Sequence, residues 1–206
     1  MKYPITRFKS LTLALKELEP YIRNGEHLQT GKPFKTLGGM RSREALANWL
    51  LCVVGNTIEA DRYTFTSDPL GGDGLILDNT TGEVWPTEHV LVPLLPDGPP
   101  TGGAAEALVL QAVADKQAKG GTAYASGKTL VVFVNAVAGP YVPNRLARNL
   151  PDDLAFAGVW VVGLQYVEEG RYTYGVTLLD RSGLPSPTFR IHVAATFDSW
   201  EVERRQ

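Results

Sequence analysis

The feature that most constrains the fold is an almost unbroken apolar run in the second half of the chain. Residues 128–135 read Lys-Thr-Leu-Val-Val-Phe-Val-Asn, with no alternation between polar and apolar side chains. A strand with one solvated face alternates, whereas a strand that is covered on both faces does not. The run therefore predicts a central strand with a packed layer on each side of its sheet.

The chain is long enough to supply those layers. It has 206 residues, of which 44% are hydrophobic and 20% charged, a composition that excludes a disordered or collagen-like protein. At roughly 100–200 residues per domain, we expect one domain with additions. We divide it into an N-terminal helix and basic loop (1–41), a core (42–150) and a C-terminal β extension (151–206).

The segments before the central run predict helices and a meander. Apolar residues at helical spacing indicate helices over 10–22, 42–54 and 104–119. Pro20 is expected to end or kink the first, and residues 24–41, rich in Gly and Lys, are expected to form a loop. Alternation predicts strands over 62–66, 75–77 and 83–92. Pro86 indicates an edge or a bulge in the third strand.

The remaining segments complete a mixed α/β domain. Residues 93–103 are expected to be an internal loop, and Pro143 to open a short basic helix. A hairpin is predicted over 159–167 and 172–179, and one more strand over 188–194. The order is helix, three-stranded meander, helix, central strand, short helix and C-terminal hairpin, which favours an α/β class with a mixed sheet.

The charges are unevenly distributed along the chain, although the net charge is only −2. Residues 1–50 carry nine Lys/Arg and four Asp/Glu, residues 51–100 carry one and eight, and residues 101–206 carry ten of each. This asymmetry indicates either a local functional site in the acidic segment or charges that only solvate turns and strand faces. The small net charge therefore does not exclude nucleic acid as a partner.

Several features place the protein in the cytoplasm. Cys52 is the single cysteine, so no intramolecular disulfide is possible. The N-terminus lacks the apolar core of a signal peptide, and no apolar run approaches the roughly 18 residues that span a membrane. Three histidines and one cysteine cannot build a Cys/His zinc cluster at the usual spacings.

One segment resembles a phosphate-binding loop. Residues 121–129 read Gly-Thr-Ala-Tyr-Ala-Ser-Gly-Lys-Thr, with five residues between the glycines where that loop has four. The predicted strand also follows the segment, whereas a phosphate-binding loop follows its strand and precedes a helix. We therefore set nucleotide binding aside here.

Two carboxylates are better candidates for chemistry. Asp73 begins one strand of the predicted meander, and Glu88 lies near the middle of the next. An antiparallel hairpin can bring such positions to the same edge of a sheet. Mg²⁺ or Mn²⁺ takes oxygen ligands, often one or two protein carboxylates together with a substrate phosphate, and can activate water for attack on a phosphodiester.

The order of elements resembles the core of the PD-(D/E)XK nuclease superfamily over residues 42–150. Its motifs are carried by Asp68-Pro69, by residues 72–76 (Gly-Asp-Gly-Leu-Ile) and by residues 87–90 (Thr-Glu-His-Val). The resemblance implies a restriction-endonuclease-like sheet with a C-terminal β-hairpin extension, and a metal-dependent nuclease acting on DNA. It assigns the metal to Asp73 and Glu88, and it matches Glu44 and Gln111 to further site positions.

The chain departs from the family pattern at Val90, which stands where the family has a lysine. Three alternatives are open: Lys116 or Lys128 replaces that lysine, His89 bends into the site, or the site is inactive. Strand alternation places His89 on the face opposite Glu88.

Basic side chains that could contact phosphates lie in three places. The candidates are Lys32, Lys35, Arg41 and Arg43 beside the N-terminal loop, Lys116 and Lys119 on the long helix, and Arg145 and Arg148 on the short one. The alternative for each is a solvated surface. A nuclease-like fold without activity, serving as a protein- or DNA-binding subunit, remains the rival interpretation, and the C-terminal hairpin could form a homodimer interface. A small-molecule-binding domain is a third interpretation.

Overall fold

A computed structural model describes residues 10–92, 103–134 and 141–206. Within these ranges the chain forms five α-helices and eight strands. The helices are α1 (Leu11–Arg23), α2 (Glu26–Thr30), α3 (Ser42–Ile58), α4 (Ala104–Ala125) and α5 (Pro143–Arg148). The strands are β1 (Tyr63–Thr66), β2 (Gly74–Asp78), β3 (Val84–Val92), β4 (Thr129–Val134), β5 (Gly158–Glu168), β6 (Arg171–Leu178), β7 (Thr188–Val193) and β8 (Trp200–Arg204). The internal loop expected at 93–103 lies, except for its last residue, outside the described residues.

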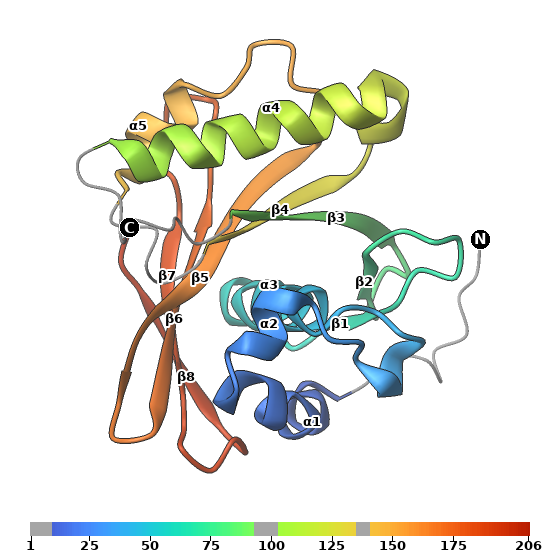
Figure 1. The fold of residues 1–206 in the computed structure, drawn as a ribbon, viewed down its shortest axis with the longest axis vertical. Coiled ribbons are helices and arrows are strands. Elements are labelled where there is room, and N and C mark those ends of the chain that lie inside the picture. The colour runs from blue at the N-terminus through green and yellow to red at the C-terminus, as the bar shows by residue number, and fades with distance from the viewer. Residues whose placement is uncertain (1–9, 93–102, 135–140) are drawn as a thin grey trace.

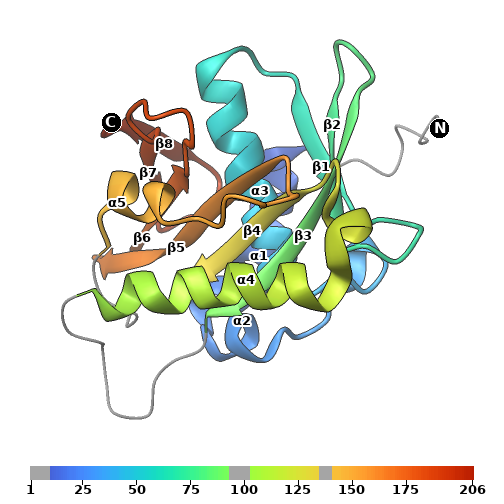
Figure 2. The same cartoon turned by 90° about the horizontal axis from the view of Figure 1, so that it is seen from above.

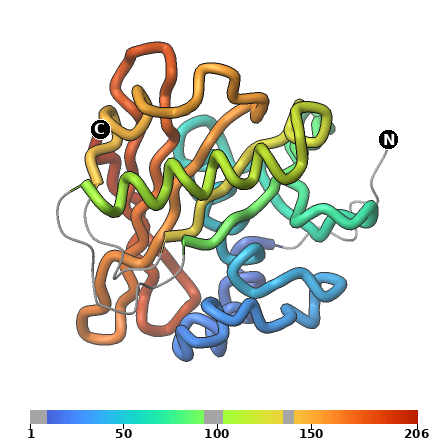
Figure 3. Tube along the Cα trace, turned by 45° about the horizontal axis from the view of Figure 1, so that its top comes forward, coloured from blue at the N-terminus to red at the C-terminus, as the bar shows by residue number. Residues whose placement is uncertain are grey.

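The eight described strands belong to one sheet, and their order across it follows their order along the chain. The sheet curls, with α1, α2 and α3 inside the curl and α4 across the opposite face (Figures 1 and 2). Figure 3 shows α4 lying over the sheet. Its contacts are with β3, which precedes it in the chain, and with β4, which follows it. The molecule therefore has helices on both faces of its central strands.

Strand β4 is the central strand that the apolar run predicts. Leu130 and Val132 are buried in the cluster that includes the apolar side of α4. Val131 and Phe133 are buried in the cluster that includes α3. Successive side chains of a strand point to opposite faces, so a strand packed on both faces needs apolar residues at consecutive positions. The prediction of two covered faces is confirmed.

The predicted meander is also confirmed. Strand β1 pairs antiparallel with β2, β2 pairs antiparallel with β3, and β4 lies parallel to β3 on its other side. Pro86 faces Leu75 of β2, and β3 pairs with β4 only from Thr87 onward. The missing N–H of Pro86 therefore falls where β3 has a neighbour on one side only, which is the edge position that a proline tolerates.

The C-terminal part adds more to the sheet than a hairpin. Strand β5 lies parallel to β4, and β6, β7 and β8 follow in antiparallel order. The predicted hairpin corresponds to β5 and β6, but β8 was not expected. Trp200 of β8 packs edge-on against Trp49 of α3, with 5.1 Å between the ring centroids. The last strand thus helps to cover α3.

Two expectations for the N-terminal segment are met only in part. Helix α1 does not end at Pro20 but continues to Arg23, because Leu18 and Ile22 on either side are both buried in the core; a kink at Pro20 stays a prediction. The expected loop at 24–41 contains α2 and a 3-10 helix (Lys35–Leu37). Each of these short helices buries one leucine, so tertiary packing holds turns that have too few residues to show a periodic pattern.

The fold is a mixed α/β domain architecture, as the order of elements predicts. In the part of the chain that the structure describes, none of the helices combines the length and the apolar character that crossing a bilayer requires. The division at residues 41 and 150 and the cytoplasmic location stay predictions.

Candidate functional site

The two candidate carboxylates come together at one end of the β2–β3 hairpin. Gly74 is paired with Thr87, so Asp73, one residue before β2, lies beside Glu88. The Oδ2 atom of Asp73 accepts a hydrogen bond of 2.7 Å from the backbone N–H of His89. This bond fixes the Asp73 side chain against β3 next to Glu88.

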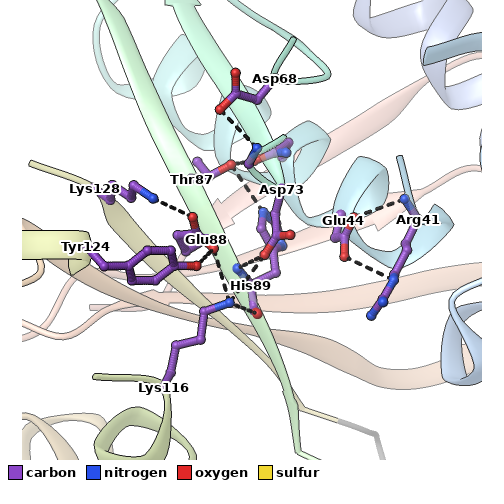
Figure 4. Close-up of polar contacts among 12 residues, drawn as sticks. Arg41, Glu44, Asp68, Asp73, Thr87, Glu88, His89, Lys116, Tyr124 and Lys128 are labelled. Atoms are coloured by element: carbon purple, nitrogen blue, oxygen red, sulfur yellow. Dashed lines mark hydrogen bonds and ion pairs between the residues drawn. The ribbon is translucent and has the colours of Figure 1, made fainter. Parts of the chain in front are cut away.

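A lysine from α4 lies between the two carboxylates (Figure 4). The Nζ atom of Lys116 is 3.5 Å from Asp73 Oδ2 and 3.1 Å from Glu88 Oε2. It also donates to the backbone carbonyl of His89 at 3.1 Å. Burial lowers the pKa of Lys116, but Asp73 and Glu88 outweigh it and raise the pKa above its ordinary value. Lys116 is therefore a firmly protonated ammonium shared by both acids.

Glu88 has further partners on the same face. Its side chain is only 3% exposed, and Oε1 is 2.7 Å from the Nζ of Lys128. The hydroxyl of Tyr124 donates to Oε2. Burial alone would raise the pKa of Glu88, but the hydrogen bonds from Lys128, Tyr124 and Lys116 outweigh it and lower the pKa to about 2. Glu88 is thus held as a carboxylate.

The end of α4 brings Tyr124 and Lys128 to this position. The helix is interrupted at Gly121, whose φ of +74° favours glycine. A Cβ atom on Gly120 would lie 2.1 Å from Cδ1 of Tyr124, so the Tyr124 ring packs where a side chain is missing. The Nζ of Lys128 lies 3.8 Å from the centroid of that ring, a cation–π contact. The segment that resembles a phosphate-binding loop, residues 121–129, includes the end of α4 and the first residue of β4, and two of its residues contact Glu88.

The loop before Asp73 is shaped by Asp68. Its carboxylate accepts hydrogen bonds from the backbone N–H groups of Leu70 at 2.8 Å and Gly72 at 3.2 Å. A Cβ atom at position 72 would lie 2.4 Å from Asp68 Oδ2. Asp68 and Gly72 therefore form a tight turn that leads the chain into β2 at Asp73.

His89 lies on the face opposite Glu88, as strand alternation predicts. Its Nε2 is 3.2 Å from Thr87 Oγ1, and Thr87 donates to Asn48 Oδ1 of α3 at 2.9 Å. Burial, followed by the charge of Lys116, lowers the pKa of His89 to about 3. His89 is therefore a neutral imidazole in a buried polar chain, and its backbone rather than its side chain contacts Asp73 and Lys116.

Glu44 begins α3 on another side of the same pocket. One oxygen accepts from the backbone N–H of Arg41 at 3.0 Å, and the other is 3.7 Å from Arg41 Nε. Burial raises the pKa of Glu44. Its contacts cap the helix, and it faces the pocket without being one of the groups that contact Lys116.

A pocket of about 440 Å³ opens in front of Asp73 and Lys116. Its walls come from residues 38–41 and Glu44, from the loop at 67–73, from α4 and from His89. The charged side chains in this lining are Arg41, Glu44, Asp68, Asp73, Lys116 and Lys119. Glu88 lies behind Lys116 and Tyr124, so Asp73 is the member of the carboxylate pair that reaches the pocket.

Several predicted site residues lie elsewhere. Gln111 is exposed on α4 and donates to Asp115 at 2.7 Å. Arg145 forms a two-pronged ion pair with Glu106, with N–O distances of 2.6 and 2.8 Å. Glu106 and Lys116 are ten residues apart on α4, about 15 Å at 1.5 Å per residue. Helix α5, which carries Arg145, is therefore remote from the carboxylate pair.

The predicted basic cluster at the N-terminal loop is divided by the fold. Arg41 is exposed and lines the pocket. Arg43 is buried and donates to the carbonyl of Gln29 at 3.4 Å. The Nζ of Lys32 lies 3.1 Å from His27 Nε2. Lys35 lies in the 3-10 helix, and Arg148 on α5 donates to the carbonyl of Asn144, one turn earlier. Of the predicted basic residues, Arg41, Lys116 and Lys119 line the pocket.

The sequence carries little signal for three residues that complete the site, namely Tyr124, Thr87 and Asn48. Tyr124 follows two glycines, and neither spacing nor charge marks it. Thr87 and Asn48 are polar residues within apolar patterns, which is a signal of buried polar contacts but not of their partners.

In the structure the carboxylate pair faces one protonated lysine. Among the described residues, no group of three or more His, Cys, Asp or Glu side chains is arranged to hold a metal ion. Asp73 and Glu88 nevertheless present oxygens to one cationic atom, Lys116 Nζ. Mg²⁺ commonly uses one or two carboxylates and completes its shell with water and phosphate.

Comparisons of the chain with protein-family models, with curated proteins and with solved structures find no match.

Proposed function

We propose that the protein is a metal-dependent nuclease that hydrolyses phosphodiester bonds in DNA, with Asp73, Glu88 and Lys116 at its centre. One observation carries the proposal: the Nζ of Lys116 lies 3.5 Å from Asp73 Oδ2 and 3.1 Å from Glu88 Oε2. A lysine from α4 thus lies beside the carboxylates. The family pattern has its lysine at position 90, where this chain has a valine.

The arrangement of elements supports a restriction-endonuclease-like core. Helix α3 is followed by the β1–β3 meander, by α4 and by β4, which lies parallel to β3. This order of elements is the one on which the resemblance to the PD-(D/E)XK superfamily rests. Asp73 immediately precedes the second strand of that core and Glu88 lies in the third, which supports the proposal.

Each group of the chain has a distinct role in the proposed reaction. Asp73 and Glu88 would hold Mg²⁺ or Mn²⁺, which when bound supplies Lewis-acid stabilisation of the phosphodiester and lowers the pKa of water. Lys116 keeps its proton because its pKa is raised, so it stabilises developing negative charge and does not act as a base. Arg41 and Lys119, on the walls of the same pocket, bind neighbouring phosphates, which positions the DNA.

The test is cleavage of supercoiled plasmid DNA with Mg²⁺, with Mn²⁺ and with a chelator. Wild-type protein is expected to nick the plasmid only with the metal. Asp73→Asn, Glu88→Gln and Lys116→Met are each expected to reduce the rate by at least about 100-fold, the usual order for losing an electrostatic catalytic group. Asp115→Asn, an exposed acid on α4, is the matched control and should retain the wild-type rate. Full activity in Asp73→Asn or Glu88→Gln would refute the assignment.

One observation favours a second candidate, a DNA-binding subunit without nuclease activity. Both oxygens of Glu88 already accept hydrogen bonds or ion pairs from Lys128, Tyr124 and Lys116. A carboxylate so well satisfied can be a structural anchor. In that case the protein binds DNA equally with Mn²⁺ and with a chelator, never cleaves it, and shows no Mn²⁺ binding that depends on Asp73.

A further inference from the structure

Lys128 is a charged group at the site to which the proposed reaction gives no role. Its Nζ lies 2.7 Å from Glu88 Oε1, whereas Lys116 and Tyr124 contact Oε2. Lys116 also contacts Asp73. Glu88 therefore meets two ammonium groups, and the one from Lys128 faces the oxygen turned away from Asp73 and Lys116 (Figure 4).

The consequence of this arrangement is a neutral cluster. Asp73 and Glu88 contribute two negative charges, and Lys116 and Lys128 contribute two positive charges at contact distances of 2.7 to 3.5 Å. In a partly buried site, charges a few ångströms apart interact strongly. A divalent cation that approaches Glu88 thus meets repulsion from Lys128 as well as attraction to the carboxylates.

The contacts of Lys128 hold its charge in place. The ammonium is 3.8 Å from the centroid of the Tyr124 ring, and Glu88, its ion-pair partner, is almost completely buried. The Tyr124 hydroxyl supplies a neutral hydrogen bond to the same carboxylate. Lys128 and Tyr124 therefore act on Glu88 in different ways, one through charge and the other through orientation.

Resting on the proposed function, we infer that Lys128 keeps the affinity of the Asp73–Glu88 pair for a divalent cation low in the free protein, while Tyr124 orients Glu88. A phosphate group bound in the pocket adds negative charge to the site. This negative charge compensates for the positive charge of Lys128 and favours binding of the cation. The cation and the phosphodiester consequently bind better together than alone, and the coupling is reciprocal.

Whether cation binding becomes tighter or weaker when Lys128 is replaced distinguishes this role from a structural one. If Lys128 only held Glu88 in position, replacing it would weaken cation binding, because groups that orient a metal ligand normally increase affinity. If its charge opposes the cation, a neutral replacement strengthens binding. Lys128→Gln retains a side-chain N–H donor and removes the charge, Lys128→Met removes both, and Lys128→Arg retains the charge.

The experiment is a calorimetric titration of the full chain with Mn²⁺ alone. Lys128→Gln and Lys128→Met are expected to bind Mn²⁺ about tenfold more tightly than wild type, the order expected for removing one nearby charge. Lys128→Arg is expected to bind like wild type, and Tyr124→Phe several-fold more weakly. Far-UV circular dichroism and a thermal unfolding curve establish that each variant is folded, and the two neutral variants give independent readings.

A second titration measures the coupling. A short phosphorothioate-linked oligothymidine is added before Mn²⁺, and its presence is expected to tighten Mn²⁺ binding more in wild type than in Lys128→Gln. Equal or weaker Mn²⁺ binding by both neutral variants would overturn the inference and leave the proposed function standing. Absence of Mn²⁺ binding in wild type and in both neutral variants would contradict the proposed metal site itself.

Discussion

At the scale of single residues, a buried hydroxyl connects the site to the core. Thr87 lies between His89 Nε2, at 3.2 Å, and Asn48 Oδ1, at 2.9 Å. Thr87→Val keeps the shape but leaves both partners unsatisfied. We expect it to lower the free energy of unfolding by about 1–3 kcal/mol, measured by urea denaturation. Thr80→Val, at an exposed turn, should change little, and equal effects of the two substitutions would contradict the buried chain.

His89 predicts a pH dependence of stability. Its pKa is lowered in the folded protein from 6.5 to about 3 by burial, so below pH 6.5 the unfolded chain binds a proton that the folded chain does not. The stability contributed by neutral His89 is complete above 6.5 and is lost as the pH falls. Between pH 7 and pH 5 the wild type should lose about 2 kcal/mol more than His89→Gln.

The measurement is urea denaturation of both proteins at several pH values with a chelator present. His192→Gln, on β7, is the control and should keep the pH dependence that His89 causes. Parallel profiles for wild type and His89→Gln would show that His89 does not titrate as its burial requires.

The residues of the site differ in how far the sequence could predict them. Asp73 and Glu88 are placed by a hairpin and by strand alternation, which are local rules. Val90 shows that the strand lacks a lysine, but which basic residue replaces it depends on how α4 lies across β3. That packing decides that Lys116 contacts both acids, whereas the parallel pairing of β3 with β4 brings Lys128 to Glu88. Tyr124 reaches Glu88 through a helix break that no periodic pattern describes.

At the scale of elements, the end of α4 is the part most sensitive to substitution. A Cβ atom on Gly120 would lie 2.1 Å from Tyr124 Cδ1, so Gly120→Ala must displace the ring from Glu88. We expect a loss of about 1–3 kcal/mol in unfolding free energy. The pKa of Tyr124, raised to about 12 by burial and by Glu88, should fall toward its ordinary value.

An ultraviolet pH titration of the tyrosines follows that change. Gly103→Ala provides the control, because Gly103 precedes the same helix and a Cβ atom there would meet nothing within 4 Å. If Gly120→Ala left both the stability and the tyrosine titration unchanged, the packing of Tyr124 on the helix end would be wrong.

The elements that the sequence failed to predict are short or marginal in pattern. Helix α2 has five residues, too few for a hydrophobic period, and it forms because Leu28 is buried against neighbouring helices. Strand β8 alternates Trp200 and Val202 with two glutamates, but it is brief and highly charged. Both depend on long-range packing, whereas β4 and the meander carry their pattern locally.

At the scale of the whole molecule, one buried cluster joins α1 and α3 to the C-terminal strands. Leu11 of α1, Trp49 of α3, at 0% exposure, and Phe197 before β8 all belong to it. We therefore expect one cooperative unfolding transition, with coincident near- and far-ultraviolet circular dichroism curves. Two separated transitions would show that the C-terminal strands fold independently of α1 and α3.

The proposed function of the whole molecule depends on the Asp73–Glu88 pair. The position of a bound cation tests this proposal most directly. Crystals of the protein soaked in Mn²⁺ can be measured at a wavelength where manganese scatters anomalously. The predicted result is an anomalous peak within about 2.0–2.6 Å of oxygens from both Asp73 and Glu88, absent in Asp73→Asn. A peak bound elsewhere, or a site in which Lys116 and Lys128 keep both carboxylates and exclude the ion, would contradict the metal-dependent nuclease.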